Sequence, residues 1–352
     1  MLRILPSGLR WLTWPFSLLY QFITSVRNAI FDAGFRSIYQ STIYTISIGN
    51  LTIGGTGKTP HIEYLLRLLA NRYTLATLSR GYGRKSKGFL QAKISSSAAE
   101  IGDEPLQLFK KFGANVPVFV AEKRAEGLQK IAQLSPCPQL VLLDDAYQHR
   151  AVKPHLSLLL TDYGRLFYQD YILPLGLLRE SRQGAKRAQG VIVTKCPPTL
   201  TPHDREQIEK KIQQYTLANT PIFFSYLDYG APVPYFEAQP PLFTDATLWL
   251  VSGIAQPKLF EEAARNKFKV AGHSAVGDNH DFTKEEVKKW VKVSDHHPIL
   301  TTEKDWVKLK PLLEELDLAH SHFYYWPIQV AFFDERFDSF LLSEVAKQRP
   351  VW

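Results

Sequence analysis

Cysteine and methionine are scarce in this sequence of 352 residues, which has two cysteines, Cys137 and Cys196, and a single methionine. Two cysteines provide neither a disulfide framework nor a thiolate metal cluster. We therefore expect a protein of a reducing compartment rather than a disulfide-stabilised secreted domain. Long apolar runs are missing too, because no stretch reaches the roughly 18 consecutive apolar residues that indicate a spanning helix.

Long lysine runs and repeats of aromatic and basic residues are also absent, although the net charge is +8 and the pI is near 9.2. The positive excess favours an acidic partner such as a phosphate compound or an anionic membrane surface. Since the basic residues are spread along the chain, we expect no nucleic-acid partner. The hydrophobic content of 45% and the length are those of a globular protein with room for two lobes.

The first 35 residues differ from the rest, being rich in Leu, Trp, Phe and Ile with arginines between them. They carry no cleavage-site pattern of a signal peptide. Bulky apolar residues recur at mixed helical spacing from Trp11 to Val26, which indicates a helix lying in a membrane interface. A helix packed on the protein's own core is the alternative, but the terminal position and the aromatic residues favour the membrane.

The most informative segment is a glycine-rich loop between a predicted strand at 44–48 and a predicted helix at 61–69. A strand, such a loop and a helix are the setting of a phosphate-binding loop, in which backbone N–H groups and the helix N-terminus face an anion. Lys58 would reach the β- and γ-phosphates of ATP, and Thr59 would hold Mg²⁺. The predicted nucleotide-binding residues are Gly54, Gly55, Thr56, Gly57, Lys58 and Thr59.

This loop departs from the standard pattern at two positions. Thr52 stands where the standard loop has its first glycine, and Ile53 stands where deviant loops of some ATPases carry a second lysine. A plain surface turn is the alternative interpretation. The flanking strand and helix, together with the Lys-Thr pair, favour nucleotide binding.

The rest of the chain alternates predicted strands and helices. The apolar run 139–143 ends in Asp144 and Asp145, the arrangement in which a carboxylate binds or orients Mg²⁺. Further buried strands are predicted at 155–161 and 190–194. A helix is predicted from about residue 284 to residue 291, and a last strand is predicted at 323–330. The pattern predicts an α/β fold, a doubly wound, mostly parallel sheet of the P-loop NTPase type with helices on both faces. With the membrane-associating helix at 1–35, the proline clusters near residues 200 and 232–241 divide the rest into a P-loop domain at 36–222 and a smaller α/β lobe at 223–352.

Phosphoryl transfer to an alcohol requires a metal site, a charge clamp on the γ-phosphate and a carboxylate that accepts the hydroxyl proton. Thr59 with Asp144 or Asp145 can supply the metal site, and Lys58 with an arginine can supply the clamp. Asp103, between Gly102 and Glu104-Pro105, is the candidate base, although turn carboxylates are common. His280 taken alone would more often be structural than catalytic.

Taken together, the motifs resemble the tetraacyldisaccharide 4′-kinase family. The matching blocks occur in the family's order, and the N-terminal hydrophobic helix resembles the membrane-associating helix of the family. The blocks are residues 47–60, 79–84 (Ser-Arg-Gly-Tyr-Gly-Arg), 102–105 (Gly-Asp-Glu-Pro), 144–149 (Asp-Asp-Ala-Tyr-Gln-His), 173–180, 193–197, 252–255 and 301–305.

The resemblance implies that the γ-phosphate of ATP passes to the 4′-hydroxyl of a tetraacylated glucosamine disaccharide 1-phosphate, which gives lipid IVA of lipid A biosynthesis. It further implies ATP and Mg²⁺ as cofactors, Asp103 as the catalytic aspartate, and Asp144 and Asp145 as metal-site aspartates. The positions implied to lie near the lipid or the phosphates are Arg80, Glu104, Arg124, Gln148, His149, Arg179 and Glu180.

Two departures from the family pattern stand out. Ala146 and Tyr147 replace a usual Gly-Phe pair, a change that we expect to be tolerated. The family also usually has a histidine directly after the aspartate that Asp278 matches, and this histidine is thought to partner the catalytic aspartate. Here Asn279 stands at that position and His280 follows. We expect His280 to take the role, with Asn279 as the alternative.

The implied substrate stays in a bilayer, so we expect the protein at the cytoplasmic face of the inner membrane, bound peripherally or monotopically, and as a monomer. One alternative is a membrane-associated switch ATPase, which would use nucleotide to control dimerisation. Another is a soluble metabolite kinase or ligase, in which the N-terminal helix only packs on the core.

Overall fold

The structure, a computed structural model, describes residues 11–236, 239–242, 245–278, 280–294, 296–318 and 322–347. These residues form two compact units. The larger unit comprises the described residues up to Leu227 and those from Val330 onward, whereas the smaller unit runs from Asp228 to Gln329. The chain therefore leaves the larger unit once and returns to it.

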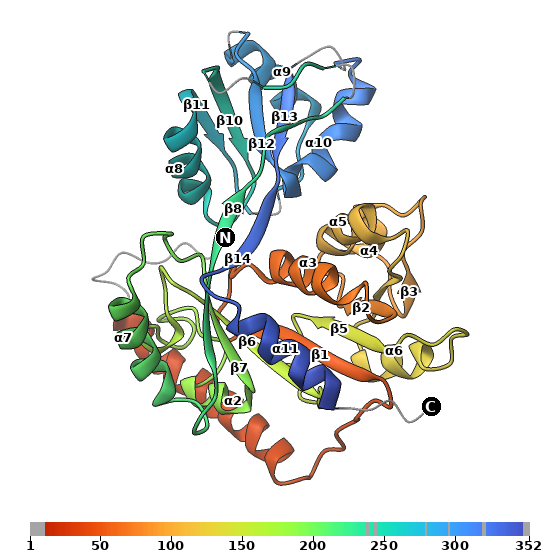
Figure 1. Cartoon of the computed structure of the whole chain (residues 1–352), viewed down its shortest axis with the longest axis vertical. Helices are drawn as coiled ribbons and strands as arrows, with labels where there is room; N and C mark the ends of the chain where they lie inside the picture. Colours follow the sequence, from red (N-terminus) through yellow and green to blue (C-terminus); the bar gives the residue numbers. More distant parts are fainter. Residues whose placement is uncertain are drawn as a thin grey trace. The chain divides into compact units, whose positions relative to one another are not determined.

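The larger unit is built on a nine-stranded sheet with the order β14-β8-β7-β6-β1-β5-β2-β4-β3 (Figure 1). The neighbouring strands from β8 through to β4 pair in parallel, and β3 adds to β4 in the antiparallel direction. The strands are β1 (Tyr44–Asn50), β2 (Leu75–Ser79), β3 (Leu90–Gln91), β4 (Val118–Val120), β5 (Leu140–Asp144), β6 (Leu156–Asp162), β7 (Gly190–Thr194), β8 (Ile222–Tyr229) and β14 (Ile328–Phe332).

Helices cover this sheet and explain why β2, β5, β6 and β7 are buried along their whole length. One apolar cluster includes Leu159, Val191 and Phe224, and another includes Leu78 and Leu143. The predicted doubly wound, mostly parallel α/β fold is thus confirmed. The helices of this unit are η1 (Trp11–Thr13), α2 (Trp14–Asp32), α3 (Lys58–Leu69), α4 (Ala98–Ile101), α5 (Asp103–Phe112), α6 (Arg124–Ile131), η2 (Phe167–Gln169), η3 (Arg182–Arg187), α7 (Pro202–Gln213) and α11 (Arg336–Lys347).

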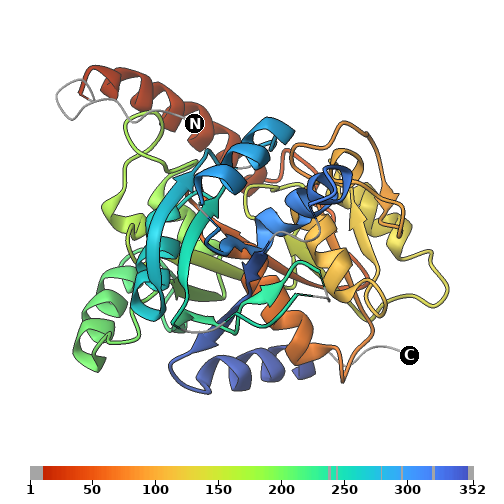
Figure 2. The ribbon, with the colours of Figure 1, turned by 90° about the horizontal axis from the view of Figure 1, so that it is seen from above.

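The C-terminal segment belongs to the larger unit, whereas the sequence-based division placed everything from residue 223 in the second lobe. Helix α11 lies beside α3 in Figures 1 and 2, and Tyr64 Oη donates a 2.6 Å hydrogen bond to Asp338. The ring of Phe337 stacks on Phe332 with centroids 4.2 Å apart. The apolar face of α11 is buried here, and this burial is the physical reason for the chain's return.

The smaller unit has its own five-stranded sheet, with the order β11-β10-β12-β13-β9 (Figure 1). Its strands are parallel except β9, and its core includes Val251, Leu309 and Phe323. Its elements are β9 (Val233–Pro234), β10 (Thr247–Ser252), α8 (Pro257–Lys267), β11 (Lys269–Ala275), α9 (Lys284–Val293), β12 (Ile299–Thr302), α10 (Glu303–Glu315) and β13 (Phe323–Trp326).

Helix α2 presents an unusual surface. Most of its large apolar side chains are exposed, while Ser17 and Phe31 are buried against the larger unit. Among the described residues, no helix combines the length and the apolar character needed to cross a bilayer. The exposed apolar residues of α2 are Trp14, Phe16, Leu18, Leu19, Phe22, Ile23, Val26 and Ile30.

Candidate active site

The glycine-rich loop connects β1 to α3 at the edge of the sheet where the parallel strands end. Asn50 is the last residue of β1, and Lys58 is the first residue of α3. Gly54 and Gly57 have φ angles of 113° and 86°, in the left-handed region that favours glycine. The loop is therefore shaped by its glycines, and it lies at the sheet edge where open α/β folds bind ligands.

Lys58 and Arg179 converge on Asp145. The Nζ of Lys58 lies 3.6 Å from Asp145 Oδ1, and Nη1 of Arg179 lies 3.3 Å from Asp145 Oδ2. Burial alone would raise the pKa of Asp145, but the two cations outweigh it, so the pKa lies below its usual value. Asp145 is thus held as a carboxylate between two cations beside the glycine-rich loop.

Asp144 is buried beside this pair and has one oxygen, Oδ1, without a hydrogen-bond partner. Burial, reinforced by the negative charge of Glu104, raises its pKa to about 7, against the opposing charges of Lys58 and Arg124. A buried oxygen without a partner suits a hard cation such as Mg²⁺, which takes one or two carboxylates together with waters and phosphate oxygens. In the described part of the chain, no group of three or more His, Cys, Asp or Glu side chains forms a closed metal cage. Thr59, in the first turn of α3, and Asp144 therefore fit a magnesium ion shared with nucleotide.

Asp103 and Glu104 begin helix α5, directly after Gly102. A side chain at Gly102 would approach Tyr82 O to 3.0 Å, because the loop 79–84 lies against this turn. Helix α5 is also tied to α3, since buried Glu63 accepts hydrogen bonds from Gln107 (3.1 Å) and Lys111 (2.6 Å). The structure thus links the element that carries Asp103 to the element that carries Lys58.

A second group of charges consists of Arg27, Arg80 and Arg124, which we call the arginine cluster. Burial, and then the charges of Arg124, Arg27 and Arg80, lower the pKa of His149 to about 4, so this histidine is neutral. Burial lowers the pKa of Arg124 to about 10, and its Nη1 donates a 2.7 Å hydrogen bond to Ala121 O. Three cations around a neutral imidazole form a setting suited to an anionic group.

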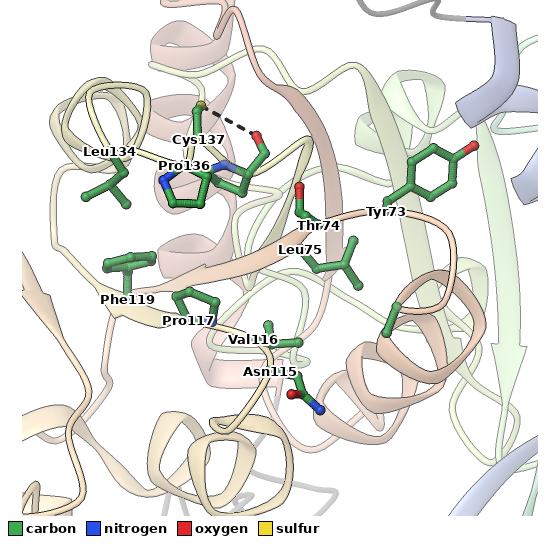
Figure 3. Close-up of a pocket in the computed structure, with 12 residues that line it drawn as sticks. Tyr73, Thr74, Leu75, Asn115, Val116, Pro117, Phe119, Leu134, Pro136 and Cys137 are labelled. Carbon is green, nitrogen blue, oxygen red and sulfur yellow. Dashed lines mark hydrogen bonds between the residues drawn. The ribbon is translucent and has the colours of Figure 1, made fainter.

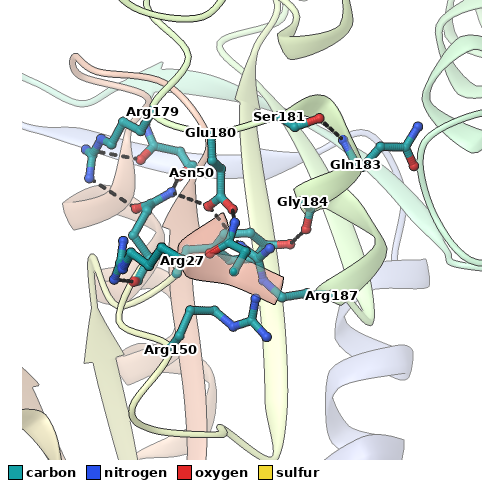
Figure 4. Close-up of polar contacts among 12 residues, drawn as sticks. Arg27, Asn50, Arg150, Arg179, Glu180, Ser181, Gln183, Gly184 and Arg187 are labelled. Atoms are coloured by element: carbon teal, nitrogen blue, oxygen red, sulfur yellow. Dashed lines mark hydrogen bonds and ion pairs between the residues drawn. The ribbon is translucent and has the colours of Figure 1, made fainter. Parts of the chain in front are cut away.

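Asn50, Arg179 and Glu180 lie close together at the end of β1 (Figure 4), and Gln148 forms hydrogen bonds with all three. Nε2 of Gln148 donates to Asn50 O (2.7 Å) and to Glu180 Oε1 (3.1 Å). The carboxylate of Glu180 is buried and also accepts hydrogen bonds from Arg187 (2.8 Å) and Asn28 (3.0 Å). Arg179 Nη1 donates to Gln148 Oε1 at 3.2 Å, so partners within the protein satisfy the side chains of both Gln148 and Glu180.

Three polar residues of this region were not singled out from the sequence. Asn50 O accepts from Gln148, and Arg27 Nη2 donates a 2.9 Å hydrogen bond to Gln148 O. Asn28 holds Glu180 from α2. The place of Asn50 at a strand end just before the loop could have indicated it, but no local signal connects residues 27 and 28 with a motif 120 residues away.

The replacement of Gly-Phe by Ala146-Tyr147 has a structural explanation. Tyr147 Oη donates a 2.8 Å hydrogen bond to Gly184 O, and the guanidinium of Arg187 lies 4.7 Å from the ring centroid. The positive φ in this turn, 47°, belongs to Asp145, so position 146 does not need glycine. A Cβ at Gly49 would lie 2.6 Å from Tyr147 Cβ, which explains the glycine at the facing position.

His280 lies in the smaller unit, where its Nε2 is 2.9 Å from Glu286 Oε1. Glu286 also belongs to the capping box at the start of α9, and the ring of His280 packs edge-on to Phe282. Asn279 falls outside the described residues. The assignment of His280 as partner of Asp103 therefore stays a prediction.

A pocket of about 300 Å³ lies at the opposite edge of the large sheet, where β2 and β4 begin (Figure 3). It is lined by Tyr73, Pro117, Pro136 and Cys137 among others. None of the predicted site residues lines it, so this pocket is separate from the candidate active site.

Comparisons with known proteins show which family the chain belongs to. A family model described as tetraacyldisaccharide-1-P 4′-kinase matches residues 9–346. A tetraacyldisaccharide 4′-kinase from Flavobacterium psychrophilum is 40% identical over 343 residues, with 96% of this chain and 97% of that protein covered. The corresponding protein of Bacteroides thetaiotaomicron is 40% identical over 351 residues, with 94% and 91% covered.

A solved structure is similar as well. The crystal structure of the "apo" form of LpxK from Aquifex aeolicus in complex with ATP has a TM-score of 0.74 and 29% identity, and the match covers 96% of this chain and 99% of that one. The family match, the relatives and this structure each span nearly the whole chain. The chain therefore belongs to the tetraacyldisaccharide 4′-kinase family.

Proposed function

We propose that this protein transfers the γ-phosphate of ATP to the 4′-hydroxyl of tetraacyldisaccharide 1-phosphate, the step of lipid A biosynthesis that forms lipid IVA. Family membership supports the reaction class and the acceptor. The observation that carries the proposal is the convergence of Lys58, Asp144 and Asp145 at a glycine-rich loop, with Glu104, next to Asp103, close enough to affect Asp144.

The residues around the loop suggest a division of roles. Lys58 binds the β- and γ-phosphates, and its contact with Asp145 holds it ready before ATP arrives. Thr59 and Asp144 would hold Mg²⁺, which would neutralise the developing phosphate charge when bound. Asp103 accepts the proton of the attacking hydroxyl, and His280 assists it. Gln148 and Arg179 orient the polar part of the acceptor or the phosphates.

The arginine cluster and its neutral histidine suit the phosphate that the acceptor carries. Arg80 and Arg124 provide positive charge, and His149 provides a neutral hydrogen-bonding ring. Glu104 contributes a negative charge near Asp144 and raises the pKa of that carboxyl. Arg27 lies on α2, the helix with the exposed apolar face. The cluster would therefore bind the polar end of a lipid whose acyl chains contact that helix.

The exposed apolar residues of α2 support docking on a membrane surface, with the protein at the cytoplasmic face of the inner membrane as a peripheral or monotopic monomer. A net charge of +8 adds attraction to anionic lipid. The apolar face would enter the interface, and the acceptor would reach the site without leaving the bilayer. Light scattering of the detergent-solubilised protein tests the oligomeric state, and a stable dimer would contradict it.

The test of the reaction is incorporation of label from γ-labelled ATP, with Mg²⁺, into tetraacyldisaccharide 1-phosphate in detergent micelles. Label at the 4′ position is the expected result. Asp103→Ala should abolish transfer while ATP affinity stays within about twofold, because the base acts only on the hydroxyl. A wild-type protein that hydrolyses ATP without labelling the lipid would overturn the acceptor, and a fully active Asp103→Ala variant would overturn the assigned base.

A further inference from the structure

Three consecutive carbonyl groups of the glycine-rich loop are held by side chains from outside the loop. Gly55 O accepts a hydrogen bond from Lys195 Nζ, and Thr56 O accepts one from Thr194 Oγ1 at 2.9 Å. Gly57 O lies 2.7 Å from His61 Nδ1, and it also accepts the backbone N–H of His61 at 3.2 Å. None of the roles proposed above uses Thr194, Lys195 or His61.

Holding a carbonyl fixes the direction of the amide that follows it. A trans peptide group is planar, and its N–H points away from its C=O. Because the carbonyls of Thr56 and Gly57 point toward β7 and α3, the N–H groups of Gly57 and Lys58 point to the opposite side. The N–H of Thr56, which follows the Gly55 carbonyl, instead donates to Gly54 O at 3.1 Å within the loop. In a phosphate-binding loop, successive backbone N–H groups must point toward the same anion.

We propose that Thr194, Lys195 and His61 are positioning residues that fix the glycine-rich loop in its phosphate-binding form before ATP arrives. They form a carbonyl clamp, by which we mean these three side chains and the carbonyls of residues 55–57. The inference rests on the proposed nucleotide binding and extends it to residues that contact the loop rather than the ligand. Preorganised amides bind an anion without first being reoriented.

Each member of the clamp is itself held in place. Thr194 is fully buried at the end of β7, and Lys195, with a φ of 57°, also pairs with Asp162 at 2.9 Å. These contacts leave the two side chains little freedom to leave the loop. The clamp thus ties the position of the glycine-rich loop to the ends of β6 and β7.

His61 connects the loop to the neighbouring strand. A carbonyl can only accept, so Nδ1 of His61 donates to Gly57 O, and Nε2 accepts from Ser225 Oγ at 3.0 Å. The ring is completely buried, which keeps it neutral and agrees with this assignment. Ser225 lies on β8 and its own carbonyl accepts the N–H of Cys196, so the histidine joins the loop to the strand ends beyond Lys195.

The first experiment compares Thr194→Val with Thr194→Ser and with the control Thr45→Val. Thr45 is equally buried, on β1, and its hydroxyl contacts His155 rather than the loop. We expect Thr194→Val to raise the Kd for Mg·ATP and the KM for ATP about tenfold, since the loss of one buried hydrogen bond can have such an effect. Thr194→Ser keeps the donor and should bind like the wild type, and Thr45→Val should lose stability without losing ATP affinity.

The second experiment separates the two bonds of His61. His61→Asn retains a donor near Nδ1 but loses Ser225, whereas His61→Leu loses both bonds. We expect His61→Asn to bind ATP within about threefold of the wild type and His61→Leu to bind it about tenfold more weakly. Adenosine, which has no phosphate, should bind every variant equally. His155→Asn is the control for loss of an imidazole away from the loop.

The outcomes distinguish the clamp from the proposed reaction. Equal ATP affinity of Thr194→Val and Thr45→Val would overturn the clamp, as would an equal loss of adenosine and ATP binding, which would show a general structural defect. If Thr194→Val fails to fold, the comparison of His61→Leu with His61→Asn still decides the question. Labelling of the lipid by the wild type is measured separately, so its failure would overturn the acceptor and leave the ATP-binding comparison intact.

Discussion

At the scale of single residues, the contact with Asp145 stabilises the charge of Lys58 at the proposed phosphate site before an anion binds. Lys58 is mostly buried, and Asp145 has a second partner in Arg179. A buried cation needs such a partner because its desolvation is otherwise costly. Arrival of the triphosphate would release Asp145 from Lys58 and leave it paired with Arg179.

This arrangement predicts the effect of removing the lysine. In Lys58→Ala, Asp145 keeps Arg179, so we expect a folded protein whose affinity for Mg·ATP and whose kcat/KM for transfer both fall, the latter by about 100-fold or more. Binding is measured by titration calorimetry and turnover with labelled ATP. Unchanged kinetics would remove the phosphate-loop assignment, and the matched variant Lys153→Ala, away from the loop, controls for loss of a positive charge.

The two cysteines should differ in reactivity. Cys196 is buried, and burial raises the pKa of its thiol to about 12, whereas Cys137 is exposed at the pocket of Figure 3. Since thiolates are the reactive form, we expect a bulky thiol reagent to label the native protein once, at Cys137. Mass spectrometry of peptides identifies the site. Rapid labelling of Cys196 in the folded protein would contradict the burial of this residue.

Single residues also show where sequence reasoning stops. The loop glycines and Lys58 stand within one short segment, and Asp144 and Asp145 stand within another, so two local patterns were enough to identify them. The partners of Glu180 come from α2, from the turn at 148 and from Arg187, and only folding brings these segments together. A carboxylate that the protein itself satisfies cannot be told from a ligand-binding one by its motif.

At the scale of elements, α2 combines two functions on different faces. Ser17 accepts the N–H of Leu175, Arg27 donates to Gln148 O, and Asp32 pairs with Arg150, so one face is fixed to the larger unit. The opposite face exposes bulky apolar side chains. A helix needed only for packing would bury those side chains, so this division favours a surface-docking role.

The docking role predicts a variant that loses membrane binding but still folds. Leu19→Ser with Phe22→Ser removes two exposed side chains that are 58% and 67% accessible, so folding should be unaffected. Binding to vesicles of anionic and zwitterionic lipid should fall at least tenfold, because burying each such side chain contributes about 1.5–3 kcal/mol. Ile94→Ser, which removes an even more exposed apolar residue outside α2, is the control. Equal vesicle binding by all three proteins would show that α2 does not dock on lipid.

Elements with strong periodicity were predicted well, and those that depend on tertiary contacts were not. The strand at 190–194 has the predicted limits. Helix α9 begins at residue 284, as predicted. The single strand expected at 323–330 is instead two strands, β13 and β14, in different sheets. Pro327 between them cannot donate to a ladder, which marks the break, but only the fold determines that the second half joins the larger sheet.

At the scale of the whole molecule, the chain's return to the larger unit makes that unit discontinuous in sequence. Its last helix is held by aromatic contacts, since Phe337 is 1% exposed, stacks on Phe332 and meets Phe223 edge-on at 5.1 Å. The smaller unit has a separate core around residues such as Phe323. Segments inserted in this way can lose stability independently when their cores do not share residues.

Phe337→Ala and Phe323→Ala form a matched pair that tests this independence. Each removes a fully buried phenyl ring from one core, which costs about 3–5 kcal/mol. Urea unfolding is followed by binding of a fluorescent ATP analogue, which reports the larger unit, and by tryptophan fluorescence, which reports mainly the smaller unit because four of the seven tryptophans lie there. Phe337→Ala should move the ATP-analogue transition to lower urea and leave the tryptophan transition in place, and Phe323→Ala should do the reverse. If both transitions move together in both variants, the two units unfold as one, and the return of the chain then couples their stabilities instead of separating them.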